Sequence, residues 1–427
     1  MALSKSLRAL WRQPLLWGVV ALLSSGAAVA QSYYKWEAVE LPASSGASCG
    51  NGTPYRVFVN RTPLTSKTVV MFEGGGACWA KGSCLGEGGL LAASNPNGVK
   101  ANYMSSLTMA AFGQITPFTA RTHLFEKIQT QSWNIVYVPY CTGDVHTGNK
   151  VALYPDADPT KAALTYYHRG GPNGEALAKW LAKTIPSPAH LLVTGFSAGG
   201  AGATANYGVL RDAVKPKLSS LLADSGPLMQ AQRNGIVATA SLPLHNKIRT
   251  AWGLDGPDGM VTKMVARYPG YGDANNLGSM TTAIAQVYKQ DRIGYATFQQ
   301  DTIYSDFSYR DFYPEIAAAA TSDERNKMLL AKWQPEVRAW TNAMKPFANV
   351  GYYVPYGRNF IGSHCLSIVG FDGTAIKEAG LSSFEVFLDN IISREGTVIK
   401  AFEGDAVIQT PAGGSLWDSI VKALTGA

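Results

Sequence analysis

The sequence predicts an α/β fold, in which a mostly parallel sheet is covered by helices on both faces. Short, almost continuously apolar runs recur along the chain, as expected of strands that are buried on both faces. Helical segments lie between these runs, and strand–helix alternation is typical of parallel sheets. The 427 residues are 46% hydrophobic and 16% charged, a balance that excludes intrinsic disorder and provides for a substantial core.

Local composition places the individual elements. The predicted strands are Thr68–Phe72, Ile135–Val138, Leu191–Thr194, Leu218–Ala223, Ile293–Phe298 and Val350–Val354. The predicted helices are Asn173–Ile185, a segment that starts after Ser197 and ends near Val214, and a late helix that follows a Ser382-x-x-Glu385 capping box.

Residues 225–291 interrupt the alternation and are rich in Gly and Pro turns. We interpret them as a cap inserted over the sheet, within a single domain that spans residues 31–427. Pockets often form beneath such insertions.

The first 30 residues have the pattern of a signal peptide. A basic start is followed by the apolar block Leu15–Leu23 and by Ala28-Val29-Ala30, which predicts cleavage between Ala30 and Gln31. No later segment reaches 18 uninterrupted apolar residues, so we expect a secreted or periplasmic protein without a membrane anchor. Without the leader the chain carries 34 basic and 30 acidic residues, a charge too small to favour nucleic acid.

Export makes disulfides the expected state of the five cysteines. Cys78 and Cys84 are spaced to close a small loop, while the partners of Cys49, Cys141 and Cys365 stay open. The odd number leaves at least one thiol free or paired between chains. No Cys or His pair has zinc-like spacing near a second pair, so we expect neither a metal nor a cofactor.

The sequence Gly195-Phe196-Ser197-Ala198-Gly199 lies where a strand passes into a helix of small residues. The G-x-S-x-G pattern alone is weak, and a glycine-rich packing turn is the alternative. In this context it is typical of a nucleophilic serine on a sharp turn at a helix N-terminus. We therefore predict Ser197 as a nucleophile.

A nucleophilic serine needs a base and an acid, which on this architecture follow it in the order Ser, acid, His. His364 lies in a loop after the last predicted strand and is the predicted base, because His245 falls in the cap. Asp301 and Asp224 both follow predicted strands and compete as the acid, and Asp306 is a weaker third candidate.

An oxyanion needs hydrogen-bond donors. The strand at residues 68–72 runs into Gly74-Gly75-Gly76, where the backbone can approach a tetrahedral intermediate closely. In such folds this loop supplies N–H groups, joined by that of the residue after the nucleophile, here Ala198.

Together these segments resemble the pectin acetylesterase family, in order over roughly residues 49–370. The matching pieces are Phe72-Glu-Gly-Gly-Gly-Ala-Cys78-Trp79 with Cys84, Val138-Pro-Tyr-Cys141-Thr-Gly-Asp144-Val-His-Thr-Gly148, Tyr167-His168-Arg169-Gly170, Gly195-Phe-Ser-Ala-Gly-Gly200, Leu222-Ala-Asp-Ser-Gly226, Gln300-Asp301 and His364-Cys365.

The resemblance implies an α/β-hydrolase fold and favours Asp301 over Asp224 as the acid. It also implies that the nucleophile is Ser197, the base His364, the oxyanion donors Gly75, Gly76 and Ala198, and the disulfide Cys78–Cys84. Gly76-Ala77 stands where members of the family usually carry a Trp before the cysteine, so we expect a reshaped pocket.

The expected function is that of a secreted, monomeric serine esterase that removes O-acetyl groups from a polysaccharide such as pectin. Three alternatives stay open. The chain hydrolyses lipid or long-acyl esters, it hydrolyses synthetic polymer esters, or it is a non-catalytic carbohydrate-binding homologue.

Overall fold

The computed structural model describes residues 32–105, 116–236, 238–404 and 408–409. The described residues from Tyr33 onwards group into one compact unit. The predicted signal peptide lies outside the described residues. Among the described helices, none combines the length and the apolar character that crossing a bilayer requires.

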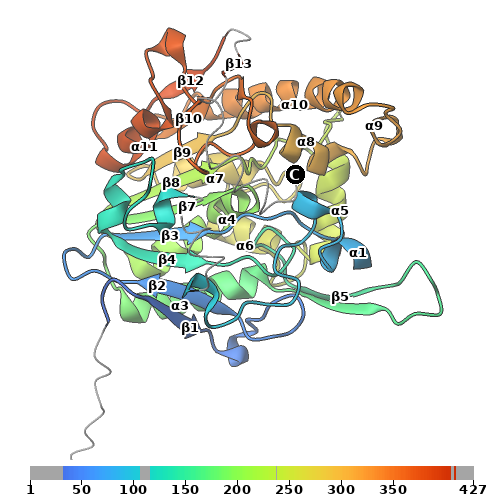
Figure 1. Cartoon of the computed structure of the whole chain (residues 1–427), viewed down its shortest axis with the longest axis horizontal. Helices are drawn as coiled ribbons and strands as arrows, with labels where there is room; N and C mark the ends of the chain where they lie inside the picture. The colour runs from blue at the N-terminus through green and yellow to red at the C-terminus, as the bar shows by residue number, and fades with distance from the viewer. Residues whose placement is uncertain (1–31, 106–115, 237, 405–407, 410–427) are drawn as a thin grey trace, which may run out of the picture. The chain divides into compact units, whose positions relative to one another are not determined.

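A twisted sheet of nine strands runs through the described part of the chain (Figure 1). The pairs β1–β2 and β2–β4 are antiparallel and all other neighbours are parallel. In spatial order the strands are β1 (Trp36–Glu40), β2 (Arg56–Asn60), β4 (Asn134–Val138), β3 (Thr68–Phe72), β7 (Leu191–Phe196), β8 (Ser219–Asp224), β9 (Arg292–Ala296), β10 (Val350–Val354) and β12 (Lys400–Phe402). All six predicted strands are present within two residues of their predicted bounds, and the α/β class is confirmed.

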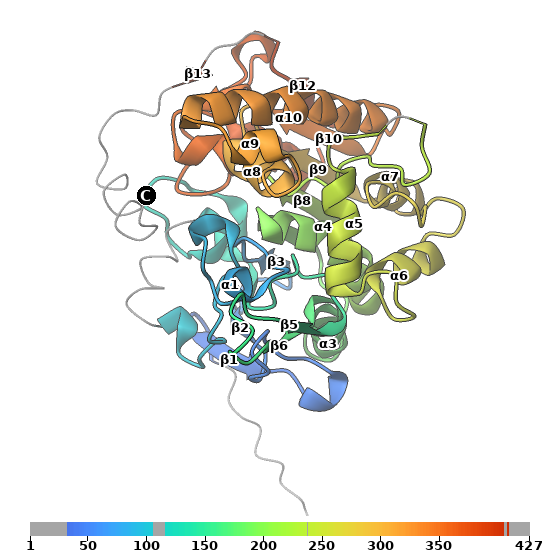
Figure 2. The same ribbon diagram turned by 90° about the vertical axis from the view of Figure 1, so that its right-hand side faces the viewer.

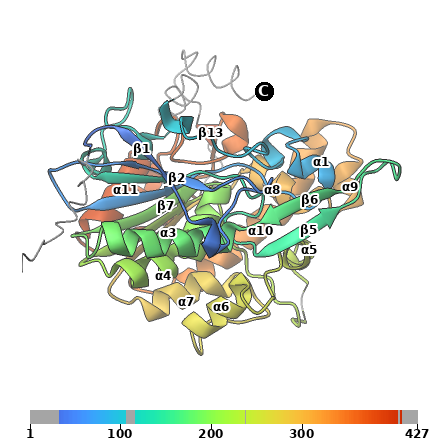
Figure 3. The same ribbon diagram turned by 90° about the horizontal axis from the view of Figure 1, so that it is seen from below.

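Helices cover both faces of this sheet, which explains why its central strands are apolar throughout. Every residue of β3, β4, β8 and β10 is buried. Figure 3 shows α3, α4, α6 and α7 together on one face. On the other face, α11 packs against β8, β9 and β10. These helices are α3 (Gly170–Thr184), α4 (Ala198–Val214), α6 (Met260–Arg267), α7 (Ser279–Val287) and α11 (Phe384–Ser393).

The segment 225–291 divides into two parts. α5 (Leu242–Trp252) lies near the carboxyl ends of the strands, where the Trp252 indole N–H donates to the Cys78 carbonyl at 2.8 Å. α6 and α7 instead pack beside α4, where Tyr288 meets Tyr207 edge to face.

The other helices follow the carboxyl ends of the strands or, in the case of α10, pack against β10 (Figure 2). They are α1 (Lys81–Cys84), α8 (Thr302–Tyr309), α9 (Pro314–Ala317) and α10 (Ser322–Met344).

One predicted helix start is wrong by a residue. The cap of α11 is Ser383 instead of Ser382, and its hydroxyl accepts the N–H of Glu385 at 3.2 Å. The Thr374 hydroxyl accepts the N–H of Phe384 at 2.9 Å, and this tertiary contact defines the first turn.

The sequence patterns did not reveal the other described strands. These are the edge strand β1, its largely buried neighbour β2, the short β12, the hairpin of β5 (Lys150–Tyr154) with β6 (Leu164–His168), and the two-residue pair of β11 (Gly357–Arg358) with β13 (Ile408–Gln409).

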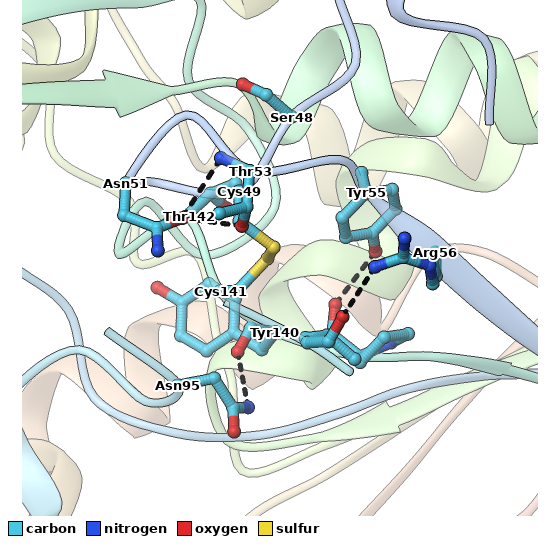
Figure 4. The surroundings of a disulfide bond; sticks show 12 residues. Ser48, Cys49, Asn51, Thr53, Tyr55, Arg56, Asn95, Tyr140, Cys141 and Thr142 are labelled. Atoms are coloured by element: carbon cyan, nitrogen blue, oxygen red, sulfur yellow. Dashed lines mark hydrogen bonds between the residues drawn. A yellow bond between two sulfur atoms is a disulfide. The ribbon is translucent and has the colours of Figure 1, made fainter. Parts of the chain in front are cut away.

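Two disulfides crosslink the loops that follow β3 and β4. Cys78–Cys84 closes the small loop predicted from the resemblance, and Cys49–Cys141 ties the N-terminal segment to the loop after β4 (Figure 4). Beside the second bond, the Gly50 N–H donates to the Cys141 carbonyl at 2.7 Å. Cys365 is a buried free thiol.

We predict that the two disulfides stabilise the fold unequally. A crosslink restricts the unfolded chain more when its loop is longer, and the loops span 92 and 6 residues. Replacing Cys49 and Cys141 by Ser should lower the free energy of unfolding by about 4–5 kcal/mol, against about 2 kcal/mol for Cys78 and Cys84. Urea denaturation of both double variants measures the difference, and equal losses would contradict the prediction.

Candidate active site

The carboxyl ends of five neighbouring strands form the edge on which the predicted site lies. β3, β7, β8, β9 and β10 are parallel and adjacent, so the segments that follow them meet. The chain passes from β3 to β4 on one side, whereas β7 lies on the other side of β3. Such a reversal leaves a crevice between strand ends, where ligands bind in open α/β sheets.

Ser197 occupies the sharp turn between β7 and α4. Its backbone has φ 56° and ψ −128°, a combination that non-glycine residues rarely adopt. The strain is held because the Ser197 N–H donates to the Asp224 carbonyl at 2.9 Å while its own carbonyl accepts the N–H of Gly200. An outlier of this kind at a strand–helix turn is characteristic of a nucleophile elbow.

Close packing explains the glycines on either side of this serine. A Cβ atom on Gly195 would lie 2.3 Å from the Gly199 carbonyl oxygen. One on Gly199 would lie 2.1 Å from the carbonyl oxygen of Phe72. Since both neighbours are backbone atoms, no rotamer change relieves either clash.

Asp301 and His364 form a direct pair. Asp301 Oδ2 accepts a hydrogen bond from His364 Nδ1 at 2.8 Å. Asp301 is also the N-cap of α8, and its Oδ1 accepts the Tyr304 N–H at 2.8 Å. Burial raises the pKa of the Asp301 carboxyl, and the contact with His364 opposes the rise. The start of α8 therefore holds the Asp301 carboxylate next to the His364 imidazole.

Asp224, the competing acid, has a different set of partners. Its carboxylate accepts the backbone N–H groups of Leu366 at 3.0 Å and Ser367 at 2.8 Å, and the Ser367 hydroxyl at 2.7 Å. The Ser225 hydroxyl donates to it and accepts the N–H of Cys365 at 3.1 Å. Asp224 therefore holds the loop that carries His364 and does not contact the imidazole.

The guanidinium of Arg358 completes the anchoring of that loop. It donates to the Cys365 carbonyl and, at 3.1 Å, to that of Gly370. Arg358 is only 4% exposed, and burial lowers the pKa of its guanidinium to about 10. Carbonyl oxygens and the nearby Asp224 charge compensate its burial.

Three backbone N–H groups beside Ser197 are available as donors. Within the described residues, the N–H groups of Gly75, Gly76 and Ala198 have no hydrogen-bond acceptor, whereas that of the adjacent Ala77 donates to the Leu91 carbonyl. The Ala198 N–H lies in the first turn of α4, where the helix dipole favours negative charge.

Polar groups beneath the glycine loop hold it in place. The Glu73 carboxylate accepts the Tyr103 hydroxyl and the Tyr140 N–H, both at 2.6 Å, and burial raises the pKa of Glu73 to about 7. His146 Nε2 donates to the Glu73 carbonyl at 2.9 Å, and burial lowers the pKa of His146 to about 4, so its imidazole is neutral. Both residues lie in segments that match the family, but no sequence pattern assigned either of them a role.

These groups surround a cavity of about 20 Å³. Its polar wall contains Gly75, Gly76, Ser197, Ala198 and His364, so the structure brings the predicted residues together, with Asp301 behind the histidine. The apolar wall consists of Leu90, Leu91, Val145, Ile303, Tyr304 and Phe307.

The walls of this cavity were not foreseen from the sequence. Among its described lining residues, none comes from the predicted cap at 225–291. Ile303 and Phe307 stand four residues apart on α8, directly after Asp301, and this helical spacing was the available signal.

Other candidate residues lie elsewhere. Asp306 pairs with Arg310 on α8 at 3.1 Å and not with His364. His245 is buried in α5. His168 lies near Cys78 and Cys84 at metal-binding distances, but the disulfide engages both sulfur atoms.

Comparison with known proteins identifies the family. A family model described as pectinacetylesterase matches residues 27–244, a little more than half of the chain. The chain belongs to the pectinacetylesterase family. The resemblance inferred from the motifs is thus confirmed.

Solved structures agree on the fold. Two crystal forms of the Wnt deacylase Notum from Drosophila superpose with TM-scores of 0.55 and 0.54 at 15% and 16% sequence identity. Each comparison covers 87% of this chain and 97% of the Notum chain. No curated protein sequence matches.

The fold is that of the α/β-hydrolases, and family membership supports an esterase that acts on acyl groups. The two disulfides and the family fit an extracellular protein.

We predict that Asp224→Asn destabilises the protein because an amide nitrogen would face the donors of Ser367. Losing charge-assisted hydrogen bonds at a buried site should lower the free energy of unfolding by about 3 kcal/mol. Urea denaturation measures this loss. Asp389→Asn on α11 is the matched control, since within the described part of the chain its carboxylate accepts a hydrogen bond only from the exposed Gln129 amide. A change below about 0.5 kcal/mol for Asp224→Asn would refute the anchoring role.

Proposed function

We propose that this protein is a serine esterase that removes O-acetyl groups from a polysaccharide such as pectin. The observation that carries the proposal is the arrangement around one cavity of the strained Ser197, the His364–Asp301 pair and three N–H groups without acceptors. Export after cleavage between Ala30 and Gln31 is part of the same proposal.

In the first step, Ser197 Oγ attacks the ester carbonyl carbon and its proton passes to His364 Nε2. Asp301 keeps the Nδ1 proton in place and stabilises the imidazolium. The N–H groups of Gly75, Gly76 and Ala198 donate to the oxyanion. When the C–O bond to the alcohol breaks, His364 gives the proton to the oxygen of the departing alcohol. Ser197 then carries the acyl group as an ester.

In the second step, water attacks the acyl carbonyl while His364 Nε2 takes a proton from it. Collapse of this second intermediate breaks the bond to Ser197 Oγ, which recovers the proton, and releases the carboxylic acid. The same oxyanion donors serve both steps.

The size of the cavity favours acetyl over longer acyl groups. A volume of about 20 Å³ corresponds to one or two water-sized groups. A methyl group is of this size, whereas an acyl chain of eight carbons is larger than this volume. The lipid esterase alternative therefore has less support than acetyl ester hydrolysis.

We predict that Ser197→Ala lowers kcat on nitrophenyl acetate by roughly 10³–10⁶ and that Asp301→Asn lowers it by roughly 10⁴. Each variant removes an atom on which the first step depends. A fluorophosphonate probe should label the unaltered protein and not Ser197→Ala. Near-normal turnover by folded Ser197→Ala, or no turnover and no labelling of the unaltered protein, would overturn the proposal and leave the non-catalytic alternative.

We predict that kcat/KM on nitrophenyl esters falls by roughly tenfold or more from acetate to butyrate, because added methylene groups exceed the cavity. Ile303→Ala shortens one residue of the apolar wall. The cavity becomes larger, so the preference should shift towards butyrate. A maximum at eight carbons or more would favour the long-acyl alternative.

A further inference from the structure

A second, larger cavity adjoins the catalytic one. Its volume is about 190 Å³, and Leu91 and Phe307 line both cavities. Trp79 and Ala77, from the loop after β3, line one side of it, and the polar end of α8 lines the other. Ala77 is only 3% exposed, and its small side chain leaves this space open.

The indole of Trp79 provides a fixed aromatic surface there. Its ring packs against Phe307 at 5.6 Å and Phe312 at 5.9 Å between centroids, which restrains its orientation. Half-buried aromatic rings held in this way present a flat apolar face beside polar groups. A sugar ring carries C–H groups on its faces and hydroxyls at its rim, and matches such a wall.

Asp306 provides an acceptor for a hydroxyl. Its Oδ1 is buried and has no hydrogen-bond partner, whereas the other carboxylate oxygen lies 3.1 Å from an Arg310 nitrogen. A buried acceptor without a partner costs about 1–3 kcal/mol. A hydroxyl donor in the cavity would satisfy it.

The charge of the walls selects between kinds of glycan. Among the charged residues that line this cavity, Glu87, Asp306 and Asp311 are acidic and Arg310 is basic, while Arg325, which is not in the lining, also acts on the Asp306 carboxylate. An excess of negative charge repels a polymer that carries a carboxylate on every sugar, and salt screens this repulsion. An uncharged glycan meets no such penalty.

We propose that this second cavity is a subsite that binds an uncharged sugar residue next to the acetylated one. The proposal rests on the esterase function proposed above and, within its class of acetylated polysaccharides, replaces pectin as the preferred substrate by O-acetylated neutral glycans. Trp79 stacks on the sugar face and Asp306 accepts its hydroxyl.

The test compares acetylated xylan with acetylated polygalacturonate at matched degrees of acetylation, with nitrophenyl acetate as a reference for the catalytic groups. At low salt, kcat/KM should be at least tenfold higher on the xylan. Raising the ionic strength to about 0.5 M should reduce that ratio. The triple variant Glu87→Gln, Asp306→Asn, Asp311→Asn should reduce it as well.

Single substitutions separate the subsite from the catalytic groups. Trp79→Ala and the isosteric Asp306→Asn should each lower the ratio of xylan to nitrophenyl acetate activity by roughly tenfold, whereas the control Asp389→Asn should leave that ratio unchanged. Circular dichroism checks that each variant is folded. If Trp79→Ala does not fold, the activity ratio of Asp306→Asn alone tests the proposal.

The outcomes for the two proposals differ. If nitrophenyl acetate is hydrolysed but polygalacturonate is deacetylated as fast as xylan at low salt, the subsite proposal is wrong and the esterase function stands. Unchanged activity ratios in both single variants would also overturn it. Failure to hydrolyse any ester would overturn the esterase function itself.

Discussion

The turn from β7 into α4 packs against the end of β3 so closely that neither Gly195 nor Gly199 has room for a side chain. Backbone atoms of Phe72 and Gly199 occupy the space that a Cβ would need. This close approach holds the strained serine above the sheet and brings the first N–H of α4 next to the glycine loop after β3. The other parts of the site are arranged around this fixed point.

The histidine is held in a different way, since its loop has almost no regular structure. Several residues near His364, among them Ser363 and Cys365, have left-handed backbone conformations. The loop is ordered because Asp224 accepts two of its N–H groups and Arg358 donates to its carbonyls. The end of β8 therefore positions the base, while the end of β9 carries its acid.

The described walls of the catalytic cavity and of the adjoining cavity come from short segments outside residues 225–291. α8 begins at Asp301 and turns its apolar residues towards the catalytic cavity, while its polar end lines the adjoining one. One helix thus connects the acid to both cavities. Ala77 adds to this arrangement, because a larger side chain at that position would fill the second cavity.

The sequence by itself determined the central strands, the α3 and α4 helices, the serine turn and the family, because buried parallel strands and glycine-restricted turns impose strong local patterns. It left Asp224 and Asp301 in competition, since both follow predicted strands and only the resemblance separated them. Tertiary structure gave the two carboxylates different partners. Asp301 accepts a hydrogen bond from the His364 imidazole, whereas Asp224 accepts backbone N–H groups more than 140 residues away in sequence. The Cys49–Cys141 pairing, the edge and short strands and the cavity walls also depended on the folded chain, because contacts between distant segments leave no periodic pattern in the sequence.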